Sequence, residues 1–349
     1  MKEVFVADVG DGLCMAINTI SNETIQIDWG SQQGGRIAFE KGLHIRPDIF
    51  ILSHFHVDHY NGLLYASINS TNRWNKIREV YYPRIPDFEG KEEFMVSLLT
   101  INLRIFGSDT GVMEYDFLKA ISRINMVNFK YKPLSKGDII NINGSVFEVL
   151  WPPAKIEDNR ALTVIKRALE DFKKALEEDE KMRQLYERVK KEGVFETYLK
   201  KGKKEVKDLN SSYTNVNKEK EKLPKVVEKA NQSLKKAANH LSLALFEDNR
   251  FLFLGDTENF EIRQIFNDLK SQGRKNFYVL ITPHHGTHWD DSLREIKCIY
   301  SISSNGNKLC PKIKTHFKEI SKRSLTTYIN GDIMITTFPL KRFWWIIPW

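Results

Sequence analysis

Four side chains of types that bind metal ions lie within six residues, directly after an apolar stretch of strand length: His54, His56, Asp58 and His59. His54 and His56 stand two residues apart in an extended segment, so their side chains project in the same direction and can bind one ion. Asp58 and His59 follow at the turn into a helix and can reach a second ion. Burying these groups without partners would be costly. The spacing therefore predicts a dinuclear metal site.

Two further apolar runs deliver ligand-type side chains at their ends. One leads to Asp256, and the other leads to the adjacent pair His284 and His285. A metal site on a sheet is assembled from strand ends that are far apart in sequence. Two ions about 3.5–4 Å apart lower the pKa of bound water and stabilise both oxygens of a displacement reaction. The three stretches together predict a hydrolytic centre.

The segments around these residues predict an α/β fold. Segments 4–6 and 13–17 flank a glycine turn and predict a hairpin, and 48–53 is an apolar strand buried on both faces. A helix is expected to start at 59–68. Further strands are expected at 24–28, 146–150, 241–246 and 251–254, with a hairpin turn over 247–250.

The pattern becomes helical after residue 154. Apolar residues recur every three or four positions over 159–200, which predicts one amphipathic helix. Pro224 is a good first-turn residue and predicts the start of a second helix. The lysine-rich segment 201–222 lacks periodicity and predicts a mobile connection. We interpret this region as a helical-hairpin insertion, 155–237, in one catalytic domain formed by 1–154 and 238–349.

The predicted insertion carries nearly all of the excess positive charge. The chain has a net charge of +8, and residues 151–236 contain 23 basic and 16 acidic residues. Such a segment can attract an anionic partner, such as nucleic acid or a lipid headgroup. It can equally be a solvated helical surface, or an arm that docks a partner protein or a second copy of the chain.

Composition excludes several classes of protein. In 349 residues, 41% are hydrophobic and 28% are charged, close to the average for globular proteins. No stretch approaches the roughly 18 apolar residues of a transmembrane segment, and the N-terminus becomes polar too early for a signal peptide. Three cysteines are too few for a disulfide scaffold. We expect a reduced, cytoplasmic, folded protein.

The last seven residues, Phe343–Trp349, are unusually aromatic. They are either a last strand packed on the core or an exposed apolar peptide that docks on a partner or a membrane surface.

The sequence resembles the metallo-β-lactamase-fold hydrolases, whose HxHxDH signature is matched in full by the four residues named first. More narrowly, it is similar to the metallo-β-lactamase domain of the DNA-uptake protein ComEC. That similarity covers six stretches: 8–12, 28–30, 136–153, 239–246, 251–258 and 283–287. The resemblance implies an αββα sandwich with a dinuclear site at one edge.

The resemblance also implies roles for individual residues. His54 and His56 would bind the first ion, Asp58, His59 and His285 the second, and Asp256 would bridge the two. Asp8, Asp28, Asn239 and Ser242 would support the site. His240 lies inside the NxxS motif formed by Asn239 and Ser242, and it is either a ligand or points away.

Catalytic roles follow from the chemistry of a dinuclear centre. Asp58 would orient the attacking hydroxide, and His284 would stabilise the charge of the transition state. Relatives tend to have a His-Pro pair near the C-terminus, where this chain has Cys310-Pro311. The proton donor supplied by that histidine would be missing unless His316 or His288 replaces it.

The reaction favoured by Asp256 and by the resemblance is phosphodiester hydrolysis. The expected protein is a nuclease that acts on DNA or RNA with two divalent ions, zinc or manganese. One alternative is a hydrolase of a small lactone or thioester, which needs a narrow, closed site. Another is a nuclease effector that stays silent until it assembles with a partner protein, for example in defence against foreign DNA.

Overall fold

The computed structural model describes residues 1–69, 73–110, 114–156, 158–206 and 222–337. Within these residues, a first sheet has eight strands in the order β15 (Ile333–Thr336), β1 (Glu3–Val6), β2 (Cys14–Asn18), β3 (Thr24–Trp29), β4 (Ile49–Ile51), β5 (Glu79–Pro83), β6 (Phe129–Leu134) and β9 (Lys204–Val206). Strands β3 to β6 run parallel, and the strands at both edges pair antiparallel.

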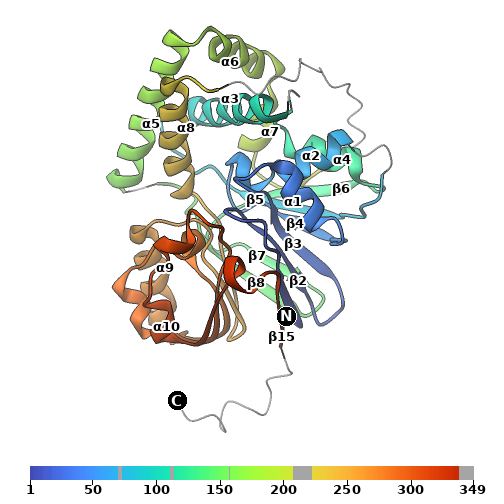
Figure 1. Cartoon of the computed structure of the whole chain (residues 1–349), viewed down its shortest axis with the longest axis vertical. Coiled ribbons are helices and arrows are strands. Elements are labelled where there is room, and N and C mark those ends of the chain that lie inside the picture. Colours follow the sequence, from blue (N-terminus) through green and yellow to red (C-terminus); the bar gives the residue numbers. More distant parts are fainter. Residues whose placement is uncertain (70–72, 111–113, 157, 207–221, 338–349) are drawn as a thin grey trace.

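A second sheet of seven strands, counted over the same residues, lies against the first (Figure 1). Its order is β14 (Ser321–Thr326), β13 (Lys297–Ser303), β12 (Asn276–Ile281), β11 (Phe251–Phe253), β10 (Ala244–Glu247), β8 (Ser145–Trp151) and β7 (Ile139–Ile142). Strands β11 to β14 are parallel, so their carboxyl ends meet at one edge. Asp256 follows β11, and the pair His284 and His285 follows β12, so both candidate ligand segments lie at this edge.

Helices cover both outer faces. The first sheet's side carries α1 (Gly35–Gly42), α2 (Asn61–Asn69), α3 (Lys91–Thr110) and α4 (Phe117–Ile124). Four further helices pack mainly on α3 and on one another: α5 (Asn159–Glu178), α6 (Glu180–Glu192), α7 (Val194–Leu199) and α8 (Lys225–Asn239). The second sheet's outer side carries α9 (Asn259–Ser271) and α10 (Phe317–Ile320). A short α11 (Thr327–Asn330) follows β14, and the short 3₁₀ helices are η1 (Val57–His59), η2 (Pro283–Gly286), η3 (Asp291–Glu295) and η4 (Cys310–Lys312).

Alternating strand residues build three apolar layers. In β4, Ile49 faces the core between the sheets, whereas Phe50 faces the helices of the first sheet. In β11, Phe251 faces the core between the sheets, whereas Leu252 faces α9 and α10. This alternation follows from the two-residue period of a strand. The layers form the αββα sandwich predicted from the sequence, and the predicted hairpins β1–β2 and β10–β11 are confirmed.

The prediction of one helix over 159–200 is wrong. Asp179 has an extended backbone and accepts a hydrogen bond from the amide of Met182, so it ends α5 and caps α6. Gly193, at φ 65°, then ends α6 in the left-handed conformation. The apolar period continues through both breaks, which is why the sequence pattern did not reveal them.

The expectation of a mobile connection over 201–222 is wrong at Lys204–Val206, which form the edge strand β9 against β6. Residues 207–221 and the aromatic segment Phe343–Trp349 lie outside the described residues. No helix among the described residues has both the length and the apolar character that a membrane crossing requires.

Candidate metal centre

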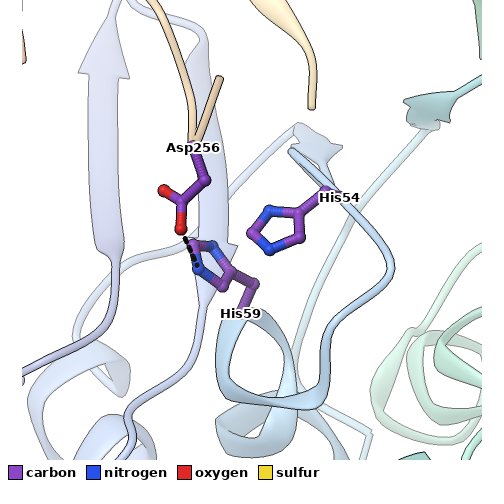
Figure 2. A group of neighbouring side chains, drawn as sticks. All are labelled: His54, His59 and Asp256. Carbon is purple, nitrogen blue, oxygen red and sulfur yellow. Dashed lines mark ion pairs between the residues drawn. The ribbon is translucent and has the colours of Figure 1, made fainter. Parts of the chain in front are cut away.

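Three chain segments bring ligand-type side chains together at one edge of the sandwich. The loop after β4 carries His54 and continues through η1 to His59, and the turn after β11 carries Asp256. A ring nitrogen of each histidine and a carboxylate oxygen of Asp256 all lie within 4.8 Å of one another (Figure 2). The short turn η2 after β12 adds His285.

Distances within this group centre on one oxygen of Asp256. Its Oδ2 lies 3.5 Å from Nε2 of His59 and 3.4 Å from Nε2 of His285. Burial alone would raise the pKa of Asp256, but His285, His59 and His284 together hold it well below its usual range. The aspartate is therefore ionised, and it faces imidazole nitrogens from two segments.

Four buried atoms in the group have no hydrogen-bond partner among the residues that the structure describes: Nε2 of His54, His59 and His285, and Oδ2 of Asp256. Unsatisfied polar atoms are costly to bury, and here they are gathered around one point. Imidazole nitrogens and a carboxylate are the ligand types that zinc and related ions prefer. The residues present therefore fit a divalent cation.

Asp28 fixes the orientation of His59. Its carboxylate accepts hydrogen bonds from Nδ1 of His59 at 2.7 Å and from the amide and hydroxyl of Ser53 at 2.7 and 2.5 Å. Asp28 is the bulged residue of β3, with φ 57°, and the bulge turns its side chain toward the loop after β4. With Nδ1 held in this way, Nε2 of His59 points at Asp256, the arrangement typical of metal-binding histidines.

The charges around His59 change its pKa. Burial would lower the pKa of His59, but Asp256 and Asp28 outweigh burial and raise it to about 10. The two carboxylates thus stabilise a positive charge at His59. A bound divalent ion would supply that charge in place of the proton.

The turn η2 separates its two histidines. His284 and His285 both adopt the left-handed conformation, with φ 46° and 58°. Nδ1 of His285 donates to the carbonyl of Ser304 at 2.8 Å, so its Nε2 faces Asp256. Nδ1 of His284 instead faces His288, while its Nε2 lies 3.8 Å from Oδ2 of Asp256.

Helix α8 contributes side chains to the centre that sequence reasoning did not identify. Lys235 lies 2.6 Å from Oδ2 of Asp58, and Oδ1 of Asn231 lies 3.3 Å from Nε2 of His56. His56 and Asp58 are also in direct contact through Nδ1 and Oδ1. Burial would raise the pKa of Asp58, but His56 and Lys235 hold it well below its usual range.

These α8 residues share one helix face. Asn231, Lys235 and Asn239 are four residues apart, so they lie in a row. Asn239 donates from Nδ2 to Oε1 of Glu258 at 3.3 Å. The only sequence signal for such a row is the polar i, i+4, i+8 spacing, which a solvated face also produces.

Other predicted residues lie around the centre or away from it. Nδ1 of His240 donates to Oε1 of Glu261 at 2.7 Å, and His240 belongs to neither group of close potential ligands among the described residues. Ser242 packs near Gly255, directly before Asp256. Asp8 contacts only its own turn and Asp332 among the contacts described.

Asp11, which sequence reasoning missed, has a larger structural role in the same turn as Asp8. It is fully buried, and its carboxylate accepts hydrogen bonds from the amides of Gly306, Lys308 and Leu309. In the sequence, the feature that could have indicated this role is the position of Asp11 between two glycines in the stretch 8–12. Asp11 thereby holds the chain that leads into η4.

An open pocket of about 710 Å³ lies beside the centre. Its wall is continuous with η2, because the amide of Lys314 donates to the carbonyl of Gly286 at 2.9 Å. The lining combines histidine and lysine side chains with apolar ones: His284, Thr287, His288, Leu309, Pro311, Lys312, Ile313, Lys314, Thr315 and His316. Such a surface offers cationic and hydrogen-bonding groups to an anionic ligand.

Solved structures with a similar fold include metallo-β-lactamase-fold proteins. MEM-A1, a subclass B3 metallo-β-lactamase from a soil metagenome, is 13% identical over 42% of this chain and 48% of its own, with a TM-score of 0.24. YhfI from Bacillus subtilis, a metallo-β-lactamase-fold protein, is 8% identical over 97% of this chain and 100% of its own, with a TM-score of 0.40. A long form of RNase Z from yeast is 6% identical over 87% of this chain and 36% of its own, with a TM-score of 0.38.

No protein-family model and no curated protein matches the sequence. The alignment with MEM-A1 spans about half of that enzyme. At these identities and TM-scores, the similarities concern only the fold of the chain. They give no information on a reaction that this protein catalyses.

Proposed function

We propose that this protein is a metal-dependent hydrolase with a dinuclear centre that cleaves phosphodiester bonds of nucleic acid. The observation that carries the proposal is the group of four buried atoms, Nε2 of His54, His59 and His285 and Oδ2 of Asp256, that have no hydrogen-bond partner among the described residues. Divalent ions bound there would supply Lewis acidity and a water of lowered pKa. In this proposal, His54 and His56 would hold the first ion, Asp58, His59 and His285 would hold the second, and Asp256 would be a ligand shared by both.

The side chains around the centre favour an anionic substrate. Lys235 brings an ammonium group next to Asp58, and Lys312 and Lys314 line the pocket beside His284. Cationic groups attract a phosphate backbone and fix its register without reading its sequence. The pocket is open, whereas a site for a small lactone or thioester is enclosed.

His284 acts in this proposal as a neutral hydrogen-bonding group. Burial is the main cause that lowers the pKa of His284 to about 3, although Asp256 opposes it. At neutral pH the ring is therefore uncharged and holds one N–H. It stabilises charge on a phosphate oxygen by donating that hydrogen bond rather than by transferring a proton.

The ComEC-like motifs support nucleic acid as the substrate class. We assign residues 155–237 as an insertion whose last helix reaches the centre, because α8 supplies Lys235 and Asn231. The catalytic domain in this assignment consists of 1–154 and 238–349. His240 is assigned outside the ligand set, since its ring contacts Glu261 and, among the contacts of the described residues, neither Asp58 nor Asp256.

The test begins with chelator-stripped protein and end-labelled single- and double-stranded DNA and RNA. Zinc or manganese is added back, and His56→Ala and Asp256→Ala are assayed in parallel. His44→Asn, which removes an exposed histidine, is the matched control. We expect metal-restored cleavage in the wild type and the control and a loss of at least about 100-fold in the other two.

A second substrate panel separates the reaction classes. The same proteins are incubated with a lactone and a thioester. Metal-restored hydrolysis of either one, without cleavage of any nucleic acid, would replace the phosphodiesterase assignment by a small-molecule hydrolase. Equal cleavage by wild type and Asp256→Ala would refute the centre itself.

A further inference from the structure

A second group of potential ligands lies on the other side of η2 from Asp256. Because His284 and His285 follow each other in the left-handed conformation, their rings diverge. His285 points inward and is 3% exposed, whereas His284 is 19% exposed and meets His288. Two consecutive non-glycine residues in this conformation strain the backbone. Such strain persists only where the surrounding structure holds the residues in place.

The second group consists of Glu258, His284 and His288, with one donor atom of each within 4.8 Å of the others. Nδ1 of His288 lies 3.1 Å from Nδ1 of His284 and 3.7 Å from Oε2 of Glu258. A single ion with bonds of about 2.0–2.2 Å holds its ligand atoms roughly 3–4 Å apart. Small side-chain rotations would therefore bring all three ligand atoms within bonding distance of one ion.

The surroundings of the group suit a cation. Oε1 of Glu258 accepts a hydrogen bond from Asn239, and no lysine or arginine pairs with Glu258 in the part of the chain that the structure describes. Nδ1 of His288 also lies 3.2 Å from the carbonyl oxygen of Thr257, so an oxygen atom faces the nitrogen that this site would use.

We propose that Glu258, His284 and His288 form a third site, separate from the dinuclear centre, for a divalent ion of the zinc class. Two imidazoles and one carboxylate leave the fourth position of a tetrahedral ion open. The three side chains are 19–21% exposed, so water or an oxygen of an anionic ligand can take that position. His284 and His288 also line the open pocket, which places the ion where an anion would enter.

This site also defines the tautomer of His284. With its Nδ1 bound to the ion, the ring carries its proton on Nε2, which lies 3.8 Å from Oδ2 of Asp256. An imidazole bound through one nitrogen donates through the other. The third site would therefore hold the His284 N–H toward the centre.

The test counts zinc ions per chain. Wild type, Glu258→Gln and His288→Asn are stripped with chelator, dialysed against the same free zinc concentration and analysed by elemental mass spectrometry. Glu258→Gln keeps the size of the side chain and the acceptor for Asn239. His316→Asn is the matched control, because His316 lines the same pocket but stacks on Trp289, outside the group.

We expect Glu258→Gln and His288→Asn each to bind one zinc ion fewer than the wild type, and His316→Asn to bind the same number. Equal zinc content in all four proteins, with unchanged thermal unfolding, would overturn the third site and leave a hydrogen-bonded side-chain cluster. The difference between proteins is the result, so it does not depend on how many ions the dinuclear centre holds. It is also independent of whether that centre cleaves phosphodiesters.

Discussion

The ammonium group of Lys235 lies 2.6 Å from Oδ2 of Asp58, although the two residues are 177 positions apart in sequence. Lys235 belongs to α8, and Asp58 belongs to the HxHxDH segment. The lysine therefore neutralises a carboxylate that we propose as a metal ligand. A cation at this position repels a metal ion and attracts a phosphate, so its removal affects the two in opposite ways.

We expect Lys235→Gln to bind zinc at least about tenfold more tightly and to hydrolyse an anionic substrate at least about tenfold more slowly, since charges about 4 Å apart interact by several kcal/mol near a protein surface. Zinc competition with a chromophoric chelator and steady-state kinetics measure the two effects. Lys236→Gln, on the exposed neighbouring position of α8, is the control and is expected to change neither. A parallel loss of both properties would indicate a purely structural role.

The second prediction concerns Asp11 and Asp8, which lie in the same glycine-flanked turn. Asp11→Ala removes the buried carboxylate that accepts hydrogen bonds from three backbone amides, so we expect the free energy of unfolding to fall by about 2–4 kcal/mol. Asp8→Ala, at a half-buried position, is expected to lower it by less than about 1 kcal/mol. Urea unfolding of both variants provides the measurement. An equal loss would contradict the special role of Asp11.

The HxHxDH segment and Asp256 could be found from sequence because each lies at the end of an apolar strand. Such strands are specified locally, and parallel strands bring their ends to one edge. His54, His59 and Asp256 therefore meet through topology that the pattern already contains. His285 lies close to Asp256 for the same reason, because β12 ends at the same edge.

The contribution of α8 could not be found in this way. Asn231 and Lys235 reach partners 175 and 177 residues away, and that contact depends on how α8 packs against α3 and α5. A polar face on an amphipathic helix looks the same in sequence whether it meets water or a metal centre. The breaks at Asp179 and Gly193 were missed for a related reason, because the apolar period continues through them.

The third prediction concerns the three cysteines. Burial raises the pKa of both Cys14 and Cys298 to about 12, whereas Cys310 is partly exposed in η4. Since the thiolate is the reactive form, we expect one thiol to react with Ellman's reagent at pH 8 in the folded protein and three after unfolding. Cys310→Ser is expected to remove the fast-reacting thiol. Fast reaction of either remaining thiol in that variant would show that the core around Cys14 or Cys298 opens readily.

The last prediction uses the charge on His59 in chelator-treated protein. Its pKa in the folded protein is about 10, above the ordinary value of 6.5, because Asp256 and Asp28 outweigh burial. A raised pKa means that the folded state binds the proton more strongly than the unfolded state. The stabilisation is thus complete below pH 6.5 and is lost as the pH rises toward 10.

We therefore expect the free energy of unfolding of metal-free wild type to exceed that of His59→Gln by most at pH 6 and by progressively less up to pH 10. Urea unfolding at a series of pH values measures this difference, and the subtraction removes contributions from other groups. In the zinc-loaded protein an ion replaces the proton, so the decline with rising pH is expected to disappear. A difference that stays constant across this range in the metal-free protein would show that His59 carries no proton between the two carboxylates.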